Sequence, residues 1–160
     1  METWRHENLQ QTPIYEDGAE DSPTLNSLLR GEISAAETYD MAITKFEGRT
    51  AASELRRIRD EHHAAMSMLR DRIQQAGSEP AESSGPWGTF ASVVTGTAMA
   101  LGMKPVLGAL KQGEEHGISE YQKAINSDVS IGCRNLIEAE LLPMCRQHVT
   151  TLQLLSAGLN

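Results

Sequence analysis

Four residues whose side chains can bind metals interrupt helical stripes of apolar residues. Glu32, His62, Glu114 and His148 each stand near the middle of a stripe with three- and four-residue spacing, the spacing that faces the core of a helical bundle. A buried carboxylate must be paired, protonated or metal-bound, because an isolated charge is strongly unfavourable in a core. Two glutamates and two neutral histidines suit iron, manganese or zinc. The sequence therefore predicts a metal site. The alternative is a metal-free Glu–His hydrogen-bond network that fixes the helix register.

An internal repeat places the two glutamates at equivalent positions. Seven identities in nineteen positions recur at an offset of 82 residues, so two segments of the chain are predicted to build the same helical unit. Glu32 corresponds to Glu114, and Tyr39 corresponds to Tyr121. Each tyrosine follows its glutamate by seven residues, two turns along the same helical face. The tyrosines are predicted either to hydrogen-bond to the site and tune it or to be core aromatics with one bonded hydroxyl.

The elements that would position these residues are all helices. Ser22 and Pro23 form a start signal, Gly48 and Gly77 are stop signals, and Pro143 should kink the last helix. No segment alternates with a period of two, so the fold class is predicted to be all-α. The predicted helices cover residues 23–47, 51–76, 105–126 and 133–157.

The heights of the four residues follow from the hairpins that these helices form. Residues equidistant from the turn of an antiparallel hairpin lie at the same level. Glu32 and His62 have their midpoint at position 47, and Glu114 and His148 have theirs at position 131, each at a predicted turn. The four side chains should therefore converge on one layer of the core.

Composition limits the class of protein. The chain has 160 residues, a net charge of −8, and 14 basic residues that do not cluster, which argues against nucleic acid as a partner. Residues 1–21 are predicted to be a flexible tail and 22–160 a single domain. The start METWRHENLQ is not a secretory signal, so the cytoplasm is the expected compartment. Cys133 and Cys145 lie about 18 Å apart on one helix, too far for a disulfide, and are predicted to be free thiols.

The segment 83–103 carries no charge. It is rich in small residues and makes a poor transmembrane helix. We favour a partly helical crossover packed along the bundle, since a bundle with parallel repeats needs a long connection at this point. The alternative is a membrane-interface element led by Trp87 and Phe90.

With these residues in place, the chain resembles the ferritin-like superfamily over residues 23–157. Gly31-Glu32 followed by Tyr39 is similar to the first helix of rubrerythrins and demethoxyubiquinone hydroxylases, and GEEHGISEY (113–121) with GPWGTF (85–90) resembles a group of bacterial ferritin-like proteins. The resemblance implies a four-helix bundle of two hairpins with a long crossover between the second and third helices. It also implies a Glu on the first and third helices and Glu-x-x-His on the second and fourth.

The chain departs from that pattern at two ligand positions. Arg59 stands three residues before His62, and Cys145 stands three residues before His148, where the family has glutamate. The departures predict a single-metal site, or a site that has lost its metal, in place of a dinuclear centre. Residues predicted to lie near the ligands and to support them are Tyr39, Tyr121, Asp60, His63, Cys145 and His116.

Three functions are consistent with the sequence. The first is a bundle that binds iron, or manganese or zinc, in metal handling or oxidative stress. The second is a metal-free structural or partner-binding module. The third, less favoured, is a membrane-peripheral oxidase. A homo-oligomer, most simply a dimer, is expected in solution. The sequence contains no motif that decides whether the protein is an enzyme.

Overall fold

The computed structural model describes residues 18–159, with only the backbone described for residues 89–95. This part of the chain contains helices and no strand, so the prediction of an all-α bundle is confirmed. The elements are α1 (Ser22–Lys45), α2 (Ala51–Gln75), α3 (Pro86–Leu101), α4 (Met103–Ile125), α5 (Ile131–Leu136), a π-helical turn η1 (Ile137–Leu141) and α6 (Leu142–Ala157).

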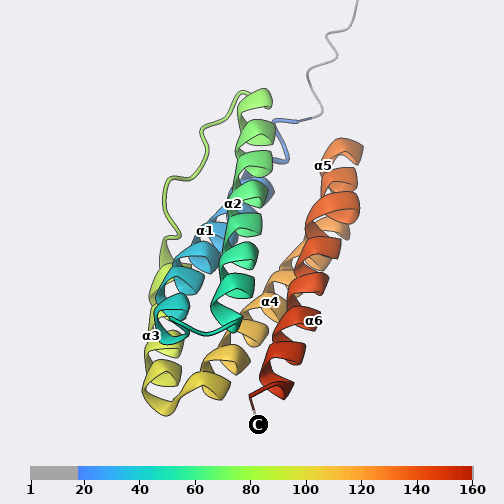
Figure 1. The fold of residues 1–160 in the computed structure, drawn as a ribbon. Helices are drawn as coiled ribbons and strands as arrows, with labels where there is room; N and C mark the ends of the chain where they lie inside the picture. Colours follow the sequence, from blue (N-terminus) through green and yellow to red (C-terminus); the bar gives the residue numbers. More distant parts are fainter. Residues whose placement is uncertain (1–17, 160) are drawn as a thin grey trace, which may run out of the picture.

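The helices form two antiparallel hairpins joined by a long connection (Figure 1). In that view α1 runs downward, α2 upward, the connection with α3 downward, α4 upward, and α5 to α6 downward. Helix α3 packs against α1 and α4. The expectation that the repeated units are parallel was wrong, because α1 and α4 run in opposite directions. It is α2 and α4 that share a direction, and the connection between them must therefore return along the bundle.

The beginning of α1 differs from the predicted cap. Asp21, not Ser22, precedes the helix, and its carboxylate accepts hydrogen bonds from the backbone N–H and the hydroxyl of Ser130, at the start of α5. Asp21 is buried and ties the two hairpins together at this end. Residues 1–17 of the predicted tail lie outside the described residues. The predicted stops at Gly48 and Gly77 are confirmed, with φ of 76° and 73°.

The last predicted helix is divided into three segments. In place of one kinked helix, the chain forms α5, the wider turn η1, and α6, with Pro143 in the first turn of α6. Proline has no N–H to bond the carbonyl four residues earlier. That lost bond gives a physical reason for a π-helical turn directly before the proline, and such turns are frequent at functional sites.

The apolar core has two halves, one on each side of the layer that holds the glutamates and histidines. Tyr121 belongs to one half, with Leu29 and Leu69 at its centre, and Tyr39 belongs to the other, with Leu55 and Ile58. The polar layer is therefore enclosed by apolar side chains above and below. Among the described residues, no helix is long and apolar enough to cross a bilayer.

Candidate metal centre

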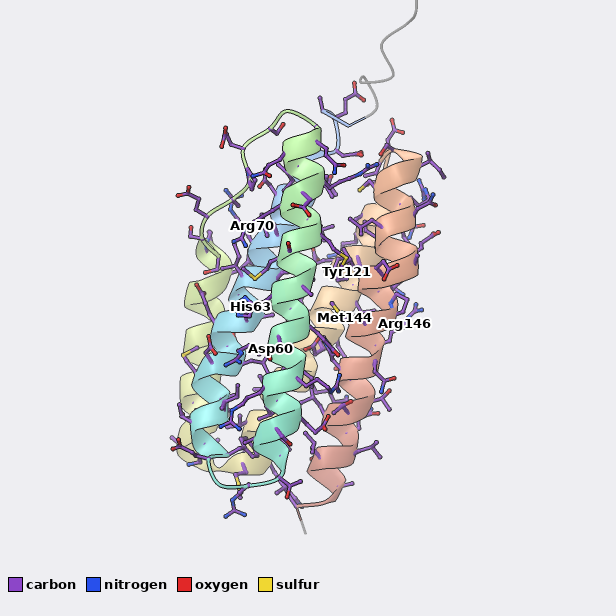
Figure 2. All side chains as sticks on the ribbon, turned by 45° about the horizontal axis from the view of Figure 1, so that its top comes forward. Asp60, His63, Arg70, Tyr121, Met144 and Arg146 are labelled. Carbon is purple, nitrogen blue, oxygen red and sulfur yellow. The ribbon has the colours of Figure 1, made fainter. Side chains whose placement is uncertain are left out.

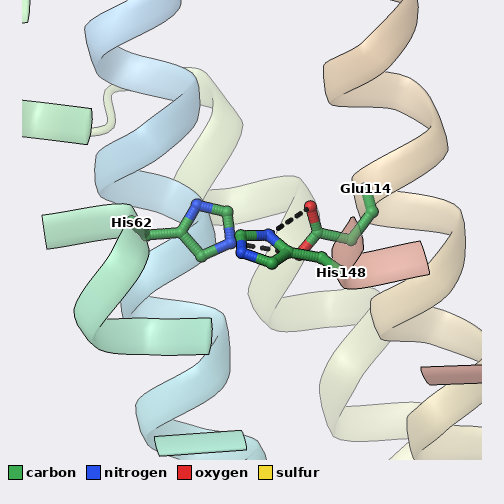
Figure 3. A group of neighbouring side chains, drawn as sticks. All are labelled: His62, Glu114 and His148. Atoms are coloured by element: carbon green, nitrogen blue, oxygen red, sulfur yellow. Dashed lines mark hydrogen bonds and ion pairs between the residues drawn. The ribbon is translucent and has the colours of Figure 1, made fainter. Parts of the chain in front are cut away.

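Glu114 is the centre of a buried network between the two hairpins (Figure 3). Its Oε1 lies 3.0 Å from Nε2 of His62 and its Oε2 lies 3.2 Å from Nδ1 of His148. The hydroxyl of Tyr39 donates to Oε1 at 2.6 Å, and the thiol of Cys145 donates to Oε2 at 3.0 Å. All five side chains are buried. One carboxylate therefore joins four groups from the other three long helices.

Each histidine also contacts a carboxylate that it does not share. Nδ1 of His62 lies 2.7 Å from Glu32, and Nε2 of His148 lies 2.7 Å from Glu61. The two rings are neighbours, with centroids 4.9 Å apart. Each imidazole thus has one nitrogen on the shared Glu114 and the other on an outer carboxylate. Outer carboxylates of this kind fix the orientation of metal-binding histidines in many proteins.

The outer carboxylates are held in turn by further donors. Tyr121 donates a short hydrogen bond to Glu32, and Arg57 donates to Glu61 at 2.6 Å. Arg57 also bonds Glu54 at 3.1 Å on the partly exposed face of α2. The network therefore runs from the buried tyrosine to a surface arginine without a gap.

The two repeat units exchange their tyrosines. Tyr39 of α1 donates to Glu114 of α4, and Tyr121 of α4 donates to Glu32 of α1. Two copies of one helix placed antiparallel produce this crossed pattern, because each tyrosine then lies level with the glutamate of the other copy. The repeat in the sequence is therefore a repeat of the hydrogen-bond network.

The charges of the network are set by its burial and its neighbours. Burial opposes the charged form of His62, but the carboxylates of Glu114 and Glu32 outweigh burial and raise the pKa of His62 to about 10. Burial would raise the pKa of Glu114, yet His62 and His148 outweigh it and hold that pKa well below its usual value. Without metal, the site therefore holds an imidazolium between carboxylates at neutral pH.

The hydroxyl and thiol donors are kept protonated. Burial, together with the charge of Glu114, raises the pKa of Tyr39 and of Cys145 well above the ordinary values. Burial and the charge of Glu32 do the same to the pKa of Tyr121. These groups therefore donate hydrogen bonds at neutral pH and do not supply a thiolate or phenolate.

Removing either tyrosine hydroxyl should destabilise the protein. We expect Tyr39→Phe and Tyr121→Phe each to lower the free energy of unfolding by roughly 1.5–3 kcal/mol, the range for hydrogen bonds to charged groups. Because His62 joins Glu32 and Glu114, the effects should not add in the double variant. Urea unfolding of the metal-free proteins measures both effects. A loss below about 0.5 kcal/mol in each single variant, or a double variant whose loss equals the sum of the two, would contradict the prediction.

The structure brings some of the predicted supporting residues to the network and leaves others outside it. Cys145, Tyr39 and Tyr121 contact the glutamates. Asp60 and His63 are exposed on α2, away from the cluster, and Asp60 pairs with Arg59 at 2.8 Å (Figure 2). They do not support the four core residues, because the rotation of α2 that buries His62 turns both of them to solvent.

His116 lies on the exposed side of α4. Its ring is 4.9 Å from that of Trp87, the second residue of α3, and it contacts none of the four core residues. The side chain of Phe90, the other leading residue of the predicted membrane-interface element, lies outside the described residues.

The sequence interpretation missed the role of Glu61. Glu61 directly precedes His62 in the sequence, and its carboxylate is bonded to His148 and Arg57. Burial would raise the pKa of Glu61, yet His148 and Arg57 outweigh it and lower that pKa. The available signal was Arg57 one turn earlier on the same helix, a spacing that favours an ion pair.

A metal ion fits the inner part of this network. One ligand atom each from His62, Glu114 and His148 lies within 4.8 Å of the others, so these three buried residues of the described chain could hold a metal ion. Two imidazoles and one carboxylate are the donor set of many iron(II) and zinc sites. Glu32 is not a member of this group, because it contacts the outer nitrogen of His62.

A comparison with families of known sequence places the chain in one of them. The profile of a family described as a domain of unknown function matches residues 20–127. The chain belongs to this family, DUF2383. The matched part contains Glu32, His62 and Glu114, whereas His148 follows it. None of the curated proteins and none of the solved structures compared with the chain matches it.

Proposed function

We propose that this DUF2383 protein binds one divalent metal ion, iron or the related manganese or zinc, and acts in metal handling or in the response to oxidative stress. His62, His148 and Glu114 are the ligands. Glu32 and Glu61 are positioning residues that hold the two imidazoles. This differs from a four-ligand site in that Glu32 acts through His62.

One observation carries the proposal. Each histidine has its outer nitrogen on a carboxylate of its own and its inner nitrogen on the shared Glu114. A hydrogen-bond network that only fixed helix register would not need two oriented imidazoles around one carboxylate. In the metal-free protein, the proton on His62 supplies a positive charge between the carboxylates, and a bound metal cation would supply that charge instead.

The residues around the ligands have separate tasks in this proposal. Bound iron or manganese would supply one-electron redox chemistry, and zinc would supply a Lewis acid. Tyr39 and Cys145 donate to Glu114 and hold its two oxygens in place. The apolar halves of the core enclose the layer from above and below.

The arrangement of the helices supports a ferritin-like architecture, which we propose for this bundle. Two antiparallel hairpins, a connection that returns along the bundle, and polar groups at mid-height are what that architecture implies. Arg59 and Cys145 stand where the ferritin-like pattern has glutamate ligands, and this difference argues for one metal ion and against two.

Elemental analysis tests the proposal. Protein purified without a metal-affinity column and reconstituted with iron(II), manganese(II) or zinc(II) should carry about one ion per chain. His62→Ala should lose it, and His63→Ala, a change at the exposed neighbouring histidine, should keep it. Glu32→Gln should weaken binding by about 10- to 100-fold without abolishing it, as expected for a positioning residue. A parent protein without metal after all three reconstitutions contradicts the proposal.

The second candidate function is a metal-free structural or partner-binding module. This candidate is favoured because the polar groups of the core already have partners. Among the described buried side-chain N and O atoms, only Ser22 Oγ lacks a hydrogen-bond partner. Charged groups whose partners are all present can form a stable core without an ion. The same elemental analysis separates the two, because this candidate requires a metal-free protein of full stability.

A further inference from the structure

A cavity of about 710 Å³ lies between α1 and α4, where the first turn of α3 reaches them. Glu32 and Tyr121 lie among its buried lining residues, and the exposed Gly31, Gly113 and His116 lie where it reaches the surface. Small-molecule sites usually have volumes of about 300–1,000 Å³. The cavity therefore has the size of a ligand site and an opening through which a ligand can enter.

Glycines in the interior of α1 and α4 keep this space open. A Cβ atom at Gly31 or Gly113 would meet no atom within 4 Å, and one at Gly117 would meet Cys145 Sγ at an ordinary 3.5 Å. Close packing of the helices therefore does not require these glycines. Glycine destabilises a helix interior relative to alanine. The repeat nevertheless has a glycine before each glutamate. Because these glycines have no side chains, the space beside them remains open as the cavity.

The walls suit a flat apolar body. Leu28 and Ala35 line the cavity from α1, and Leu110 lines it from α4. Trp87 covers it from α3, with its ring 4.9 Å from that of His116. Aromatic rings pack favourably against such a surface. An aromatic ligand would therefore find apolar contacts on three sides.

The charge of the lining is predominantly negative. Three carboxylates line the cavity, those of Glu32, Glu114 and Glu120, against the single imidazolium of His62. None of its described lining residues is a lysine or an arginine. Glu32 and Glu114 lie at its buried end, where a charge is poorly screened by solvent. An anionic ligand would be repelled there, and an ammonium group would be attracted.

We propose that this cavity binds an aromatic amine, with the ring against Trp87 and the ammonium group toward Glu32. The cavity borders the proposed metal centre, since His62 and Glu114 are among its lining residues, but the contacts that we propose for the amine do not require the metal. Amines of this class would bind to the metal-free protein in the same way.

Calorimetric titration of the metal-free full-length protein with tryptamine, indole and indole-3-acetate tests this proposal. The three probes share one ring and differ in charge. We expect tryptamine to bind at least tenfold more tightly than neutral indole, and the anion to bind more weakly still. Binding of all three with equal affinity, or no binding of tryptamine, overturns the proposal.

Filling the cavity provides the structural control. Gly113→Leu places a side chain in the open space, and we expect at least a tenfold loss of tryptamine affinity with no loss of thermal stability. Gly108→Leu is the matched change, because Gly108 lies on the same helix, a Cβ there also meets nothing within 4 Å, and it does not line this cavity. Tryptamine binding that survives Gly113→Leu, or that is lost equally in Gly108→Leu, overturns the assignment to this cavity. Metal content is not a readout here, so failure of the metal proposal leaves this result unchanged.

Discussion

Glu114→Gln is expected to lower the free energy of unfolding of the metal-free protein by about 3–5 kcal/mol, the range found when one partner of a buried ion pair is removed. The carboxylate accepts hydrogen bonds from Tyr39 and Cys145 and faces both His62 and His148. Glutamine has the same shape but no charge, and its NH₂ group would point at a donor. The variant would leave the charge of His62 balanced by Glu32 alone.

Urea unfolding in the presence of a chelator measures this effect. Glu115→Gln is the matched control on the same helix, since its side chain is exposed and pairs with Lys111 four residues earlier. Such a surface pair contributes about 0.5 kcal/mol or less. Equal losses in the two variants would show that the buried network does not stabilise the fold. If Glu114→Gln does not fold at all, the weaker change Tyr39→Phe removes one of the same hydrogen bonds and keeps the comparison measurable.

The heights of the four core residues were predictable from the sequence because an α-helix rises by a constant amount per residue. Glu32 and His62 lie at equal distances from the first turn, and the structure places them 2.7 Å apart. Glu114 and His148 lie at equal distances from the second turn, with 3.2 Å between their nearest atoms. The arithmetic therefore found the layer and the pairing within each hairpin.

The contacts between the hairpins were less predictable. Spacing along one helix gives the height of a side chain, but the rotation of that helix against its neighbours depends on packing. This is why the exchange of Tyr39 and Tyr121 between the repeat units did not follow from the sequence. The same uncertainty applies to Glu61, which is adjacent to His62 yet contacts His148 on another helix.

The π-helical turn η1 limited the prediction for the last helix. A prediction from residue spacing assumes a regular α-helix, with the same number of residues per turn from 133 to 157. The turn at Ile137–Leu141 interrupts that register before Cys145 and His148. Pro143 signalled an irregularity in the sequence, but the period of the bonds around it depends on the backbone of the folded helix.

The stability of the metal-free protein is expected to fall as the pH rises above 6.5. His62 faces Glu32 and Tyr39 from α1, Glu114 from α4, and His148 from α6. These carboxylates outweigh burial and raise the pKa of His62 from 6.5 to about 10. A raised pKa stabilises the folded state fully below the unfolded value, and this contribution is lost as the pH rises toward the folded value. One proton gives a slope of about 1.4 kcal/mol per pH unit, or about 2 kcal/mol between pH 7 and 8.5.

Other groups act outside this window. Glu114 and Glu61 have lowered pKa values, so their contributions are complete above about pH 4.5 and are lost only in acid. Tyr39 and Tyr121 have raised values, and they lose their contributions only above the ordinary tyrosine pKa near 10. Burial raises the pKa values of Cys133 and Cys145, and their contributions fall only as the pH reaches the ordinary thiol value near 9. The loss between pH 7 and 8.5 is therefore assigned chiefly to His62.

Chelator-treated protein unfolded by urea at several pH values gives the slope. His63→Gln should keep it, because that side chain is exposed, and His62→Gln should flatten it. Ring signals of His62 that keep the chemical shifts of an imidazolium from pH 6 to 9 in magnetic resonance spectra would establish the same point without a variant. A parent protein whose stability is level or rising over this range contradicts the prediction. The same proton competes with a metal ion for His62, so metal affinity should rise with pH across the range where metal-free stability falls, by up to about tenfold per pH unit.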